Sequence, residues 1–420
     1  MIRFESALNA RRSASASASQ WARTGPTLAL LVFAALLVVG QMYSVLPLYG
    51  AMGMTFGVAP AAVAWTSTAF GFAYAVGFLL AGPLTDRFGA RTMISFSLVV
   101  AAVATALVAT AVNVEVAIGL RVLQGFLSAM FTPAAYSYVA HHVRPERRPL
   151  ALSFLASSLL AAAVVMQVCS QLVVARLNWQ AMFLLCAPLM LAAGIAARFT
   201  LQSSSSEHKT SMVSAFRAMP RLLSRPRLVA IYFAAMILLG GFVGIYSAIA
   251  LAGPAGVAAN AHALLALRLS GLPAMIAVPL LAPWLARLTP RIRVVTGLAL
   301  AAGAALAAAF AEGNAVLLAT VLLLFLIGIV MAAPGIVELI NESVAENRGV
   351  ATSLYAFSMF AGGSICGQLV SGMTGLGFGF GAIAKVVAAV LGGGALLVIA
   401  SYFLAEPAAT SSAHLLRSER

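Results

Sequence analysis

The chain has 420 residues, of which 62% are hydrophobic and 9% are charged, and its mean hydropathy is +1.01. A soluble globular fold of this length needs far more polar surface, so the composition predicts an integral membrane protein. The formal net charge is +14. The basic residues are scattered over many loops and tails instead of forming one stripe, which argues against a nucleic-acid partner.

Twelve apolar runs follow one another along the chain. A bilayer core about 30 Å thick is crossed by about 20 apolar residues in a helix, because a helix satisfies its own backbone hydrogen bonds. The predicted spans are residues 27–50, 61–84, 92–112, 114–139, 150–175, 179–200, 228–251, 263–286, 293–311, 315–339, 350–373 and 380–404. The runs are continuous, whereas strands of a membrane barrel alternate and are only about 10 residues long. We therefore predict an all-α membrane protein with twelve transmembrane helices.

The distribution of Lys and Arg predicts the orientation of these spans. All but four of the 25 basic residues fall in tails and loops on the side of the two termini. The exceptions are Arg121, Arg176, Arg268 and Lys385. The positive-inside rule then places both termini in the cytoplasm, with residues 1–26 as a disordered tail and residues 405–420 as a second tail.

The longest polar segment, residues 202–227, divides the chain into two bundles of six spans, residues 27–201 and residues 228–404. A shift of 200 residues places identical residues of two separate loops on one another. These are Pro83 and Pro283, Arg87 and Arg287, Arg91 and Arg291, Glu146 and Glu346, Arg148 and Arg348, Ala151 and Ala351, and Ser153 and Ser353. One offset kept across two loops indicates duplicated halves, as in transporters that rock about a site at the membrane midplane.

A charged segment follows the second span and fits the pattern G-x-L-x-D-R-x-G-x-R. Its matching residues are Gly82, Leu84, Asp86, Arg87, Gly89 and Arg91, and Ala90 is the one departure. Gly89 can adopt a positive φ where the chain reverses, and Asp86 can sit near positive helix N-termini. The segment resembles the loop signature of the major facilitator superfamily. The resemblance implies a latch on the cytoplasmic side that also involves Glu146, Arg148, Glu346 and Arg348; the alternative is a turn that only fixes topology.

The fourth span carries Arg121, Gln124 and Gly125, which is similar to the R-x-x-Q-G motif of the same family. Arg121 lies about eight residues from the outer surface, where a charged side chain usually faces a cavity or a partner. The resemblance implies that Arg121 tunes a nearby protonatable group or holds an anion, with Gln124 on the adjoining face. The alternative is that Arg121 snorkels to the outer interface.

The end of the fifth span departs from the family pattern. Asn178-Trp179-Gln180 resembles the segment that follows this span in efflux members, but Gln167 and Gln171 stand where antiporters have members of a G-P and a G-G pair. The two glutamines share a helix face, so they either bond a neighbouring helix or line the pathway. A closer copy of the motif, Gly363 to Gly372 with Gln368 in place of Pro, lies in the eleventh span and is typical of tight helix packing.

Few other polar residues are predicted inside the membrane. The first span has no acid, and its polar side chains include Gln41 and Tyr43. Glu338, near the inner end of span ten, is the best proton candidate; the alternative is membership of a cytoplasmic gate with Glu342 and the second loop signature. Arg268 and Arg121 together suggest an electropositive pathway for anionic or zwitterionic cargo, and snorkelling is the alternative for Arg268. Tyr136, Tyr246 and Tyr355 are candidates to line the pathway, although most such aromatics pack or anchor.

These features predict a proton-coupled exporter of a small amphiphilic or anionic organic compound, of the drug:proton antiporter and sugar-efflux type. The alternatives are proton-coupled uptake of an organic anion, and a membrane sensor or scaffold that moves no cargo. No nucleotide-binding, metalloprotease or Ser/His/Asp grouping supports an enzyme, a metal site or a cofactor. We expect H⁺ as the driving ion, a monomer, and a location in the inner membrane of a bacterial cell.

Overall fold

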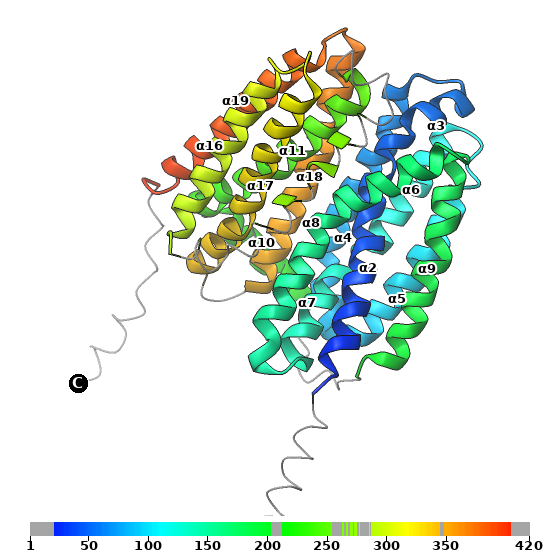
Figure 1. The fold of residues 1–420 in the computed structure, drawn as a ribbon. Helices are drawn as coiled ribbons and strands as arrows, with labels where there is room; N and C mark the ends of the chain where they lie inside the picture. Colours follow the sequence, from blue (N-terminus) through cyan, green and yellow to red (C-terminus); the bar gives the residue numbers. More distant parts are fainter. Residues whose placement is uncertain are drawn as a thin grey trace, which may run out of the picture.

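The computed structural model describes residues 21–202, 212–253, 290–344 and 348–404, with scattered positions between 263 and 289. Every regular element in this part of the chain is a helix. The helices gather into two bundles that lie side by side (Figure 1). Most of the eighth predicted span, residues 263–286, and most of the two predicted tails lie outside the described residues.

The first bundle contains α2 (Thr24–Ser44), η1 (Leu46–Leu48), α3 (Tyr49–Phe56), α4 (Pro60–Phe88), α5 (Ala90–Val108), α6 (Val114–Ser128), α7 (Phe131–His142), η2 (Pro145–Arg147), α8 (Arg148–Val174) and α9 (Trp179–Thr200). The second contains α11 (Pro226–Ala252), α16 (Pro290–Ala308), α17 (Ala315–Ser343), α18 (Arg348–Gly375) and α19 (Phe380–Ala400). A short helix, α10 (Met212–Leu223), precedes α11.

Ten helical segments of the described chain are long and apolar enough to cross a membrane, and α8, bent by 41° between Leu159 and Ala161, would be an eleventh. Each predicted span other than the eighth therefore has a helical counterpart. The first continues beyond its predicted end to Phe56 of α3. It is interrupted at η1, where Pro47 lacks the N–H that a regular α-helix would use. The fourth is divided into α6 and α7.

Three turns place asparagine directly before a helix. The side chains of Asn113, Asn178 and Asn314 accept hydrogen bonds from the first backbone N–H groups of α6, α9 and α17, at 2.9–3.0 Å. Such N-caps satisfy donors that have no partner within the helix. We call this side of the molecule the far end, and the opposite side, which carries Arg91 and Arg291, the basic end.

Glycines set the closest helix contacts in both bundles. A Cβ on Gly125 of α6 would collide with the backbone carbonyl of Phe70 in α4, and one on Gly362 of α18 with a backbone carbonyl of α11. Gly297 and Gly328 meet backbone to backbone where α16 crosses α17. Small residues let membrane helices approach in this way when water supplies no driving force.

The predicted central loop contains one helix that the sequence analysis did not anticipate. In α10, Ala218 and Leu222 are buried whereas Arg217 and Arg221 are exposed. The helix packs against α11 and α18 and touches α4 of the first bundle. It therefore lies where the two bundles meet at the basic end.

Candidate functional site

Arg121 lies at the centre of a buried polar cluster in the first bundle. Its side chain has no exposed surface. Its Nε donates to the Thr66 carbonyl of α4 at 3.2 Å, and Nη2 donates to the Gln41 carbonyl of α2 at 2.9 Å. Nη1 donates to Gln124 Oε1, one turn further along α6, at 2.7 Å. The guanidinium therefore joins three helices.

Uncharged neighbours complete this cluster. Gln124 Nε2 donates to Thr105 Oγ1 of α5 at 2.7 Å and to Gln41 Oε1 at 3.3 Å. The ring of Phe70 lies 4.3 Å from the guanidinium carbon, and that of Phe183 lies 6.0 Å away. Within the described residues, no carboxylate forms an ion pair with this charge.

The contacts are sufficient to hold the cation inside the bundle. Desolvating an ion costs several kcal/mol. Hydrogen bonds to a charged group return about 1.5–3 kcal/mol each, and a cation–π contact adds about 0.5–2 kcal/mol. Arg121 therefore does not snorkel to the surface of the bundle. Because its side chain is fully covered, cargo cannot contact it in this conformation.

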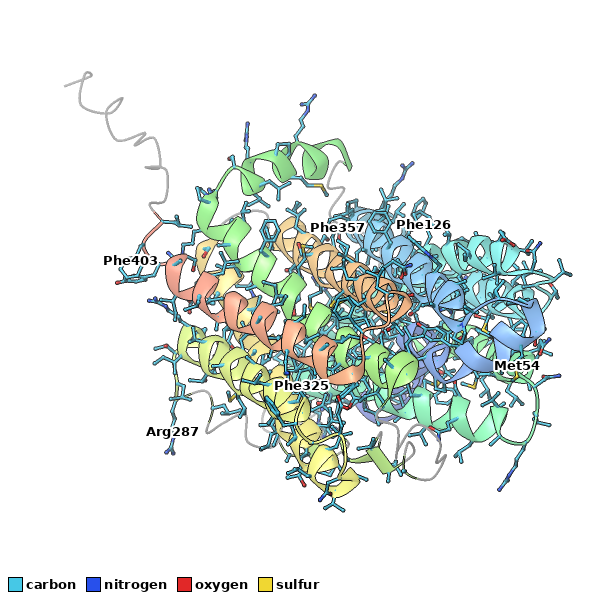
Figure 2. The ribbon with its side chains drawn as sticks, turned by 90° about the horizontal axis from the view of Figure 1, so that it is seen from above. Met54, Phe126, Arg287, Phe325, Phe357 and Phe403 are labelled. Atoms are coloured by element: carbon cyan, nitrogen blue, oxygen red, sulfur yellow. The ribbon has the colours of Figure 1, made fainter. Side chains whose placement is uncertain are left out.

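Helices α4 and α18 form the main contact between the two bundles. Thr68 Oγ1 donates to Gln368 Oε1 at 2.9 Å, and nearer the far end Ser371 Oγ donates to the Ala61 carbonyl at 2.9 Å. Figure 2, a view from above, shows Phe357 of α18 beside the helices of the first bundle. Neutral hydrogen bonds thus cross the interface between the bundles.

The same interface becomes aromatic toward the basic end. The Phe360 ring of α18 packs edge-on against Tyr74 at 4.6 Å and stacks on Phe78 at 5.6 Å, both from α4. One turn further, a Cβ on Gly82 would lie 3.5 Å from Ser353 Oγ. The first residue of the loop signature therefore touches the opposite bundle.

Most of the loop signature is helical. We expected a tight charged loop from Gly82 to Arg91, but α4 continues to Phe88 and α5 begins at Ala90. The reversal is confined to Gly89, whose φ of 82° confirms the predicted positive φ. Hydropathy marks the hydrocarbon boundary, whereas the backbone keeps its helical hydrogen bonds beyond that boundary.

The charged residues of the signature lie at the basic end. Leu84 is half-buried, whereas Asp86 and Arg87 are exposed. Arg91 Nη2 donates to the Arg198 carbonyl at the end of α9, within its own bundle. A cation at a helix C-terminus is favoured by the helix dipole. The resemblance implies that these charged residues also contact the second bundle, and this contact stays a prediction.

The second bundle repeats this arrangement. Arg291 Nη2 donates to the Ile399 carbonyl at the end of α19 at 3.1 Å. This contact is the counterpart of the bond from Arg91 to the end of α9. The caps Asn113 and Asn314 likewise occupy equivalent turns of the two bundles. The offset seen in the sequence therefore corresponds to repeated contacts.

The second pair of loops is described only in its first copy. Glu146 is exposed in η2, and Arg148 Nε donates to the Val143 carbonyl at 2.8 Å. Glu346 and the side chain of Arg348 lie outside the described residues. The predicted gate between these residues stays a prediction.

Glu338 of α17 forms an ion pair with Arg293 of α16 at the basic end of the second bundle. The Arg293 side chain is 8% exposed and that of Glu338 is 46% exposed. The sequence analysis used Arg293 only as a marker of topology and missed this partner. The pair is the clearest titratable contact near a predicted span in the described chain.

A sequence profile of the Major Facilitator Superfamily matches residues 31–367. The chain belongs to this superfamily. Its fold class and its place among transporters, not enzymes, are confirmed by this match together with the helical spans. It is 30% identical over 138 residues to the "Multidrug resistance protein B homolog" of Mycobacterium tuberculosis, a match that covers 33% of this chain and 26% of that protein.

Two further relatives match over similar lengths. The "Methylenomycin A resistance protein" of Bacillus subtilis is 30% identical over 35% of this chain and 32% of its own length. The "Tetracenomycin C resistance and export protein" of Streptomyces glaucescens is 28% identical over 34% of this chain and 27% of its own length. The matches thus span about a third or less of the length of these relatives.

Several predicted pathway residues of this major facilitator lie near the junction of the bundles. Tyr43 of α2 packs edge-on against Phe242 of α11 at 5.7 Å, and Tyr246 lies 4.9 Å from the same ring. Tyr136 of α7 and Tyr355 of α18 are partly buried. Tyr43 and Tyr246 therefore flank a ring at a contact between the bundles.

The remaining polar candidates are divided between local contacts and residues outside the description. Gln167 is buried, and its Nε2 donates to the Ala163 carbonyl of its own helix at 2.8 Å. This bond is neither of the two roles that we predicted. Gln171 is half-buried, and Arg268 lies outside the described residues.

Sequence reasoning missed the partners that complete the site. Thr66 contributes only a carbonyl, and any residue would supply that group, so no sequence signal existed. Thr105 and Thr68 are common residues in apolar helices. Gln368 was recognisable in the sequence, because it replaces the expected Pro of a known motif. Its side-chain oxygen accepts the hydrogen bond from Thr68.

Proposed function

We propose that this major facilitator is a proton-coupled exporter of a small amphiphilic or anionic organic compound, and that its two bundles rock about a central site. The names of its relatives support export, since they are resistance and export proteins.

The basic end would face the cytoplasm. This orientation is supported by the excess of Arg and Lys at that end, which the positive-inside rule associates with the cytoplasmic side. Both termini would then be cytoplasmic, and the protein would reside in the inner membrane as a monomer, without a nucleic-acid partner.

The interface between α4 and α18 carries the mechanism. Its contacts run from Ser371 and Ala61 at the far end to Gly82 and Ser353 at the basic end. Opening the basic end requires Gly82 to separate from Ser353. Interfaces of packed helices favour discrete arrangements, so the rearrangement is expected between two states.

The electrostatic character of the first bundle supports anionic or zwitterionic cargo. Arg121 brings an uncompensated positive charge into the membrane, and its hydrogen bonds are made with neutral groups. In the part of the chain that the structure describes, the cluster around Arg121 contains no acidic side chain of the kind that would bind a cationic drug. Arg268 would add a second cation to the pathway.

Glu338 would carry the proton. Its carboxylate is half-exposed at the basic end and pairs with the covered Arg293, so protonation would release a contact between α16 and α17. Cargo movement would then be linked to H⁺ through the second bundle.

A reversible crosslink tests the rocking step. In a variant lacking Cys169, Cys186 and Cys366, the changes Gly82→Cys and Ser353→Cys place two thiols at the basic end of the interface, close to disulfide distance. Oxidation should stop cargo flux in everted membrane vesicles, and a reductant should restore it. Undiminished flux through fully oxidised protein would refute the rocking mechanism. A scaffold that moves no cargo would show no flux before or after oxidation.

The chain offers a matched control pair. A Cβ on Gly367 would lie 3.9 Å from Ser247 Oγ, and both residues belong to the second bundle. Oxidation of Gly367→Cys with Ser247→Cys should leave flux unchanged, since that disulfide crosses no moving interface.

The direction and the coupling ion need a second measurement. Everted vesicles loaded with a pH gradient, acid inside, should accumulate candidate anionic amphiphiles from outside, and collapse of the gradient should abolish the uptake. Accumulation only in right-side-out vesicles would favour the uptake symporter instead. Accumulation that ignores the gradient would exclude H⁺ coupling.

A further inference from the structure

A pocket of about 550 Å³ opens at the far end of the second bundle, away from the interface between the bundles. The turn that follows α16 forms one side, and the end of α18 and the first turns of α19 form the other. Its volume lies within the range of about 300–1,000 Å³ that small-molecule sites occupy.

Two opposite charges line this pocket. The Lys385 ammonium lies 5.1 Å from the centre of the Phe310 ring, one side of the pocket wall. The Glu312 carboxylate, from the turn that follows α16, lies against Gly381 at the start of α19. Within the described residues, the two charges form no ion pair with each other. A separated pair of this kind fits a ligand that carries both charges.

The rest of the wall is apolar and exposed. Phe310 is 73% exposed and Phe378 is 47% exposed, and Val386 extends the surface down α19. Aromatic and Lys side chains at the end of a membrane helix are typical of the boundary between lipid and water. The ligand that meets such a wall is an amphiphile whose chains continue into the bilayer.

We propose that this pocket binds the headgroup of a zwitterionic phospholipid with a primary ammonium, a phosphoethanolamine, from the leaflet at the far end. The phosphate would lie against Lys385, and the ammonium would donate to Glu312, since a carboxylate accepts several hydrogen bonds. The acyl chains would pass over Phe378 and Val386. This site is separate from the proposed transport pathway.

The proposal makes a ranking among lipids. Phosphatidylcholine has a quaternary ammonium that cannot donate a hydrogen bond to Glu312, and phosphatidylglycerol has no cation. Losing one charge-assisted hydrogen bond corresponds to about tenfold weaker binding. Phosphatidylethanolamine should therefore bind about tenfold more tightly than either.

Native mass spectrometry of the purified full chain in mixed micelles tests this ranking, with the three lipids added at equal concentration. Soluble O-phosphoethanolamine, added as a competitor, tests whether the headgroup binds without acyl chains. Glu312→Gln should remove the preference for phosphatidylethanolamine, whereas Lys385→Gln, which removes the contact to the phosphate that all three lipids share, should weaken the retention of all three. Arg176→Gln, which removes a far-end cation outside the pocket, should keep the preference.

Folding and binding can be separated in the same experiment. Thermal unfolding of each variant without added lipid reports whether α19 is still in place. Equal retention of the three lipids by the wild-type chain would overturn the proposal, as would a preference that survives Glu312→Gln in folded protein, or lipid retention that is unchanged in folded Lys385→Gln protein. Competition by O-phosphoethanolamine alone, with no lipid retained, would assign the pocket to a soluble phosphoamine and also overturn it.

Discussion

Replacing Arg121 by Lys should destabilise the protein more than replacing it by Met. The first change keeps the charge and the second removes it, so the expected order is opposite to that of chemical conservation. The reason is geometric: the guanidinium reaches acceptors on α2, α4 and α6 at once, and it lies on the Phe70 ring. One ammonium group cannot reproduce that fork.

The bonds in the cluster give the magnitude. A lysine that retains the Gln124 contact still loses two hydrogen bonds to a charged group, about 3–6 kcal/mol, while the desolvated charge remains. Methionine removes the charge and its desolvation cost, and leaves Gln124 Oε1 without its donor, a loss of about 1–3 kcal/mol. The Lys variant should thus be less stable by about 2 kcal/mol.

Thermal unfolding in one detergent, at one scan rate, measures the difference as a shift of a few degrees in the apparent midpoint. A Lys variant that is as stable as the wild type would refute the reasoning, because the fork would then be irrelevant. Flux adds a second readout: loss of flux in both folded variants indicates a role in coupling, whereas flux in the Met variant indicates a purely structural role.

Two further perturbations test the packing and the ion pair. Gly362→Ala should cost about 1–3 kcal/mol, because its Cβ would collide with a carbonyl of α11, and Gly392→Ala, with open space around it, should cost nothing; equal midpoints in a thermal scan would show that α18 can shift. Glu338→Gln should abolish stimulation of flux by a pH gradient, since the amide cannot carry the proton, while Glu342→Gln on the same helix should retain it. If a pH gradient still stimulates flux in the Glu338 variant, the ion pair between Arg293 and Glu338 has a structural role only.

The spans were predictable because the bilayer imposes one signal on them. Hydropathy identified every described membrane helix, and the turn at Gly89 followed from the conformational freedom of glycine. The ends were less predictable, since α4 runs four residues past its predicted limit of Leu84 to Phe88. The helix α10 was missed, because it has only 12 residues, too few to span a bilayer, and lies within a segment rich in Ser and Arg.

The site was predictable only in part, for a reason that concerns partners. Arg121 stood out because a charge in an apolar helix is costly, and Gln124 followed from the resemblance to the R-x-x-Q-G motif. Backbone carbonyls such as that of Thr66 leave no trace in a sequence. Arg293 and Glu338 are distant along the chain, and each was assigned a separate role.

The distribution of charge suggests why rocking costs little. Two strong charged contacts stay within a bundle: Arg121 joins α2, α4 and α6, and Arg293 pairs with Glu338 between α16 and α17. The contacts described above between α4 and α18 are neutral hydrogen bonds, aromatic rings and small residues. A neutral hydrogen bond contributes only about 0.5–1.5 kcal/mol net, so exchanging a few of them for equivalent contacts is a small free-energy change. Strong bonds inside each bundle and weak ones between them are the arrangement that lets two rigid bodies pivot without unfolding either.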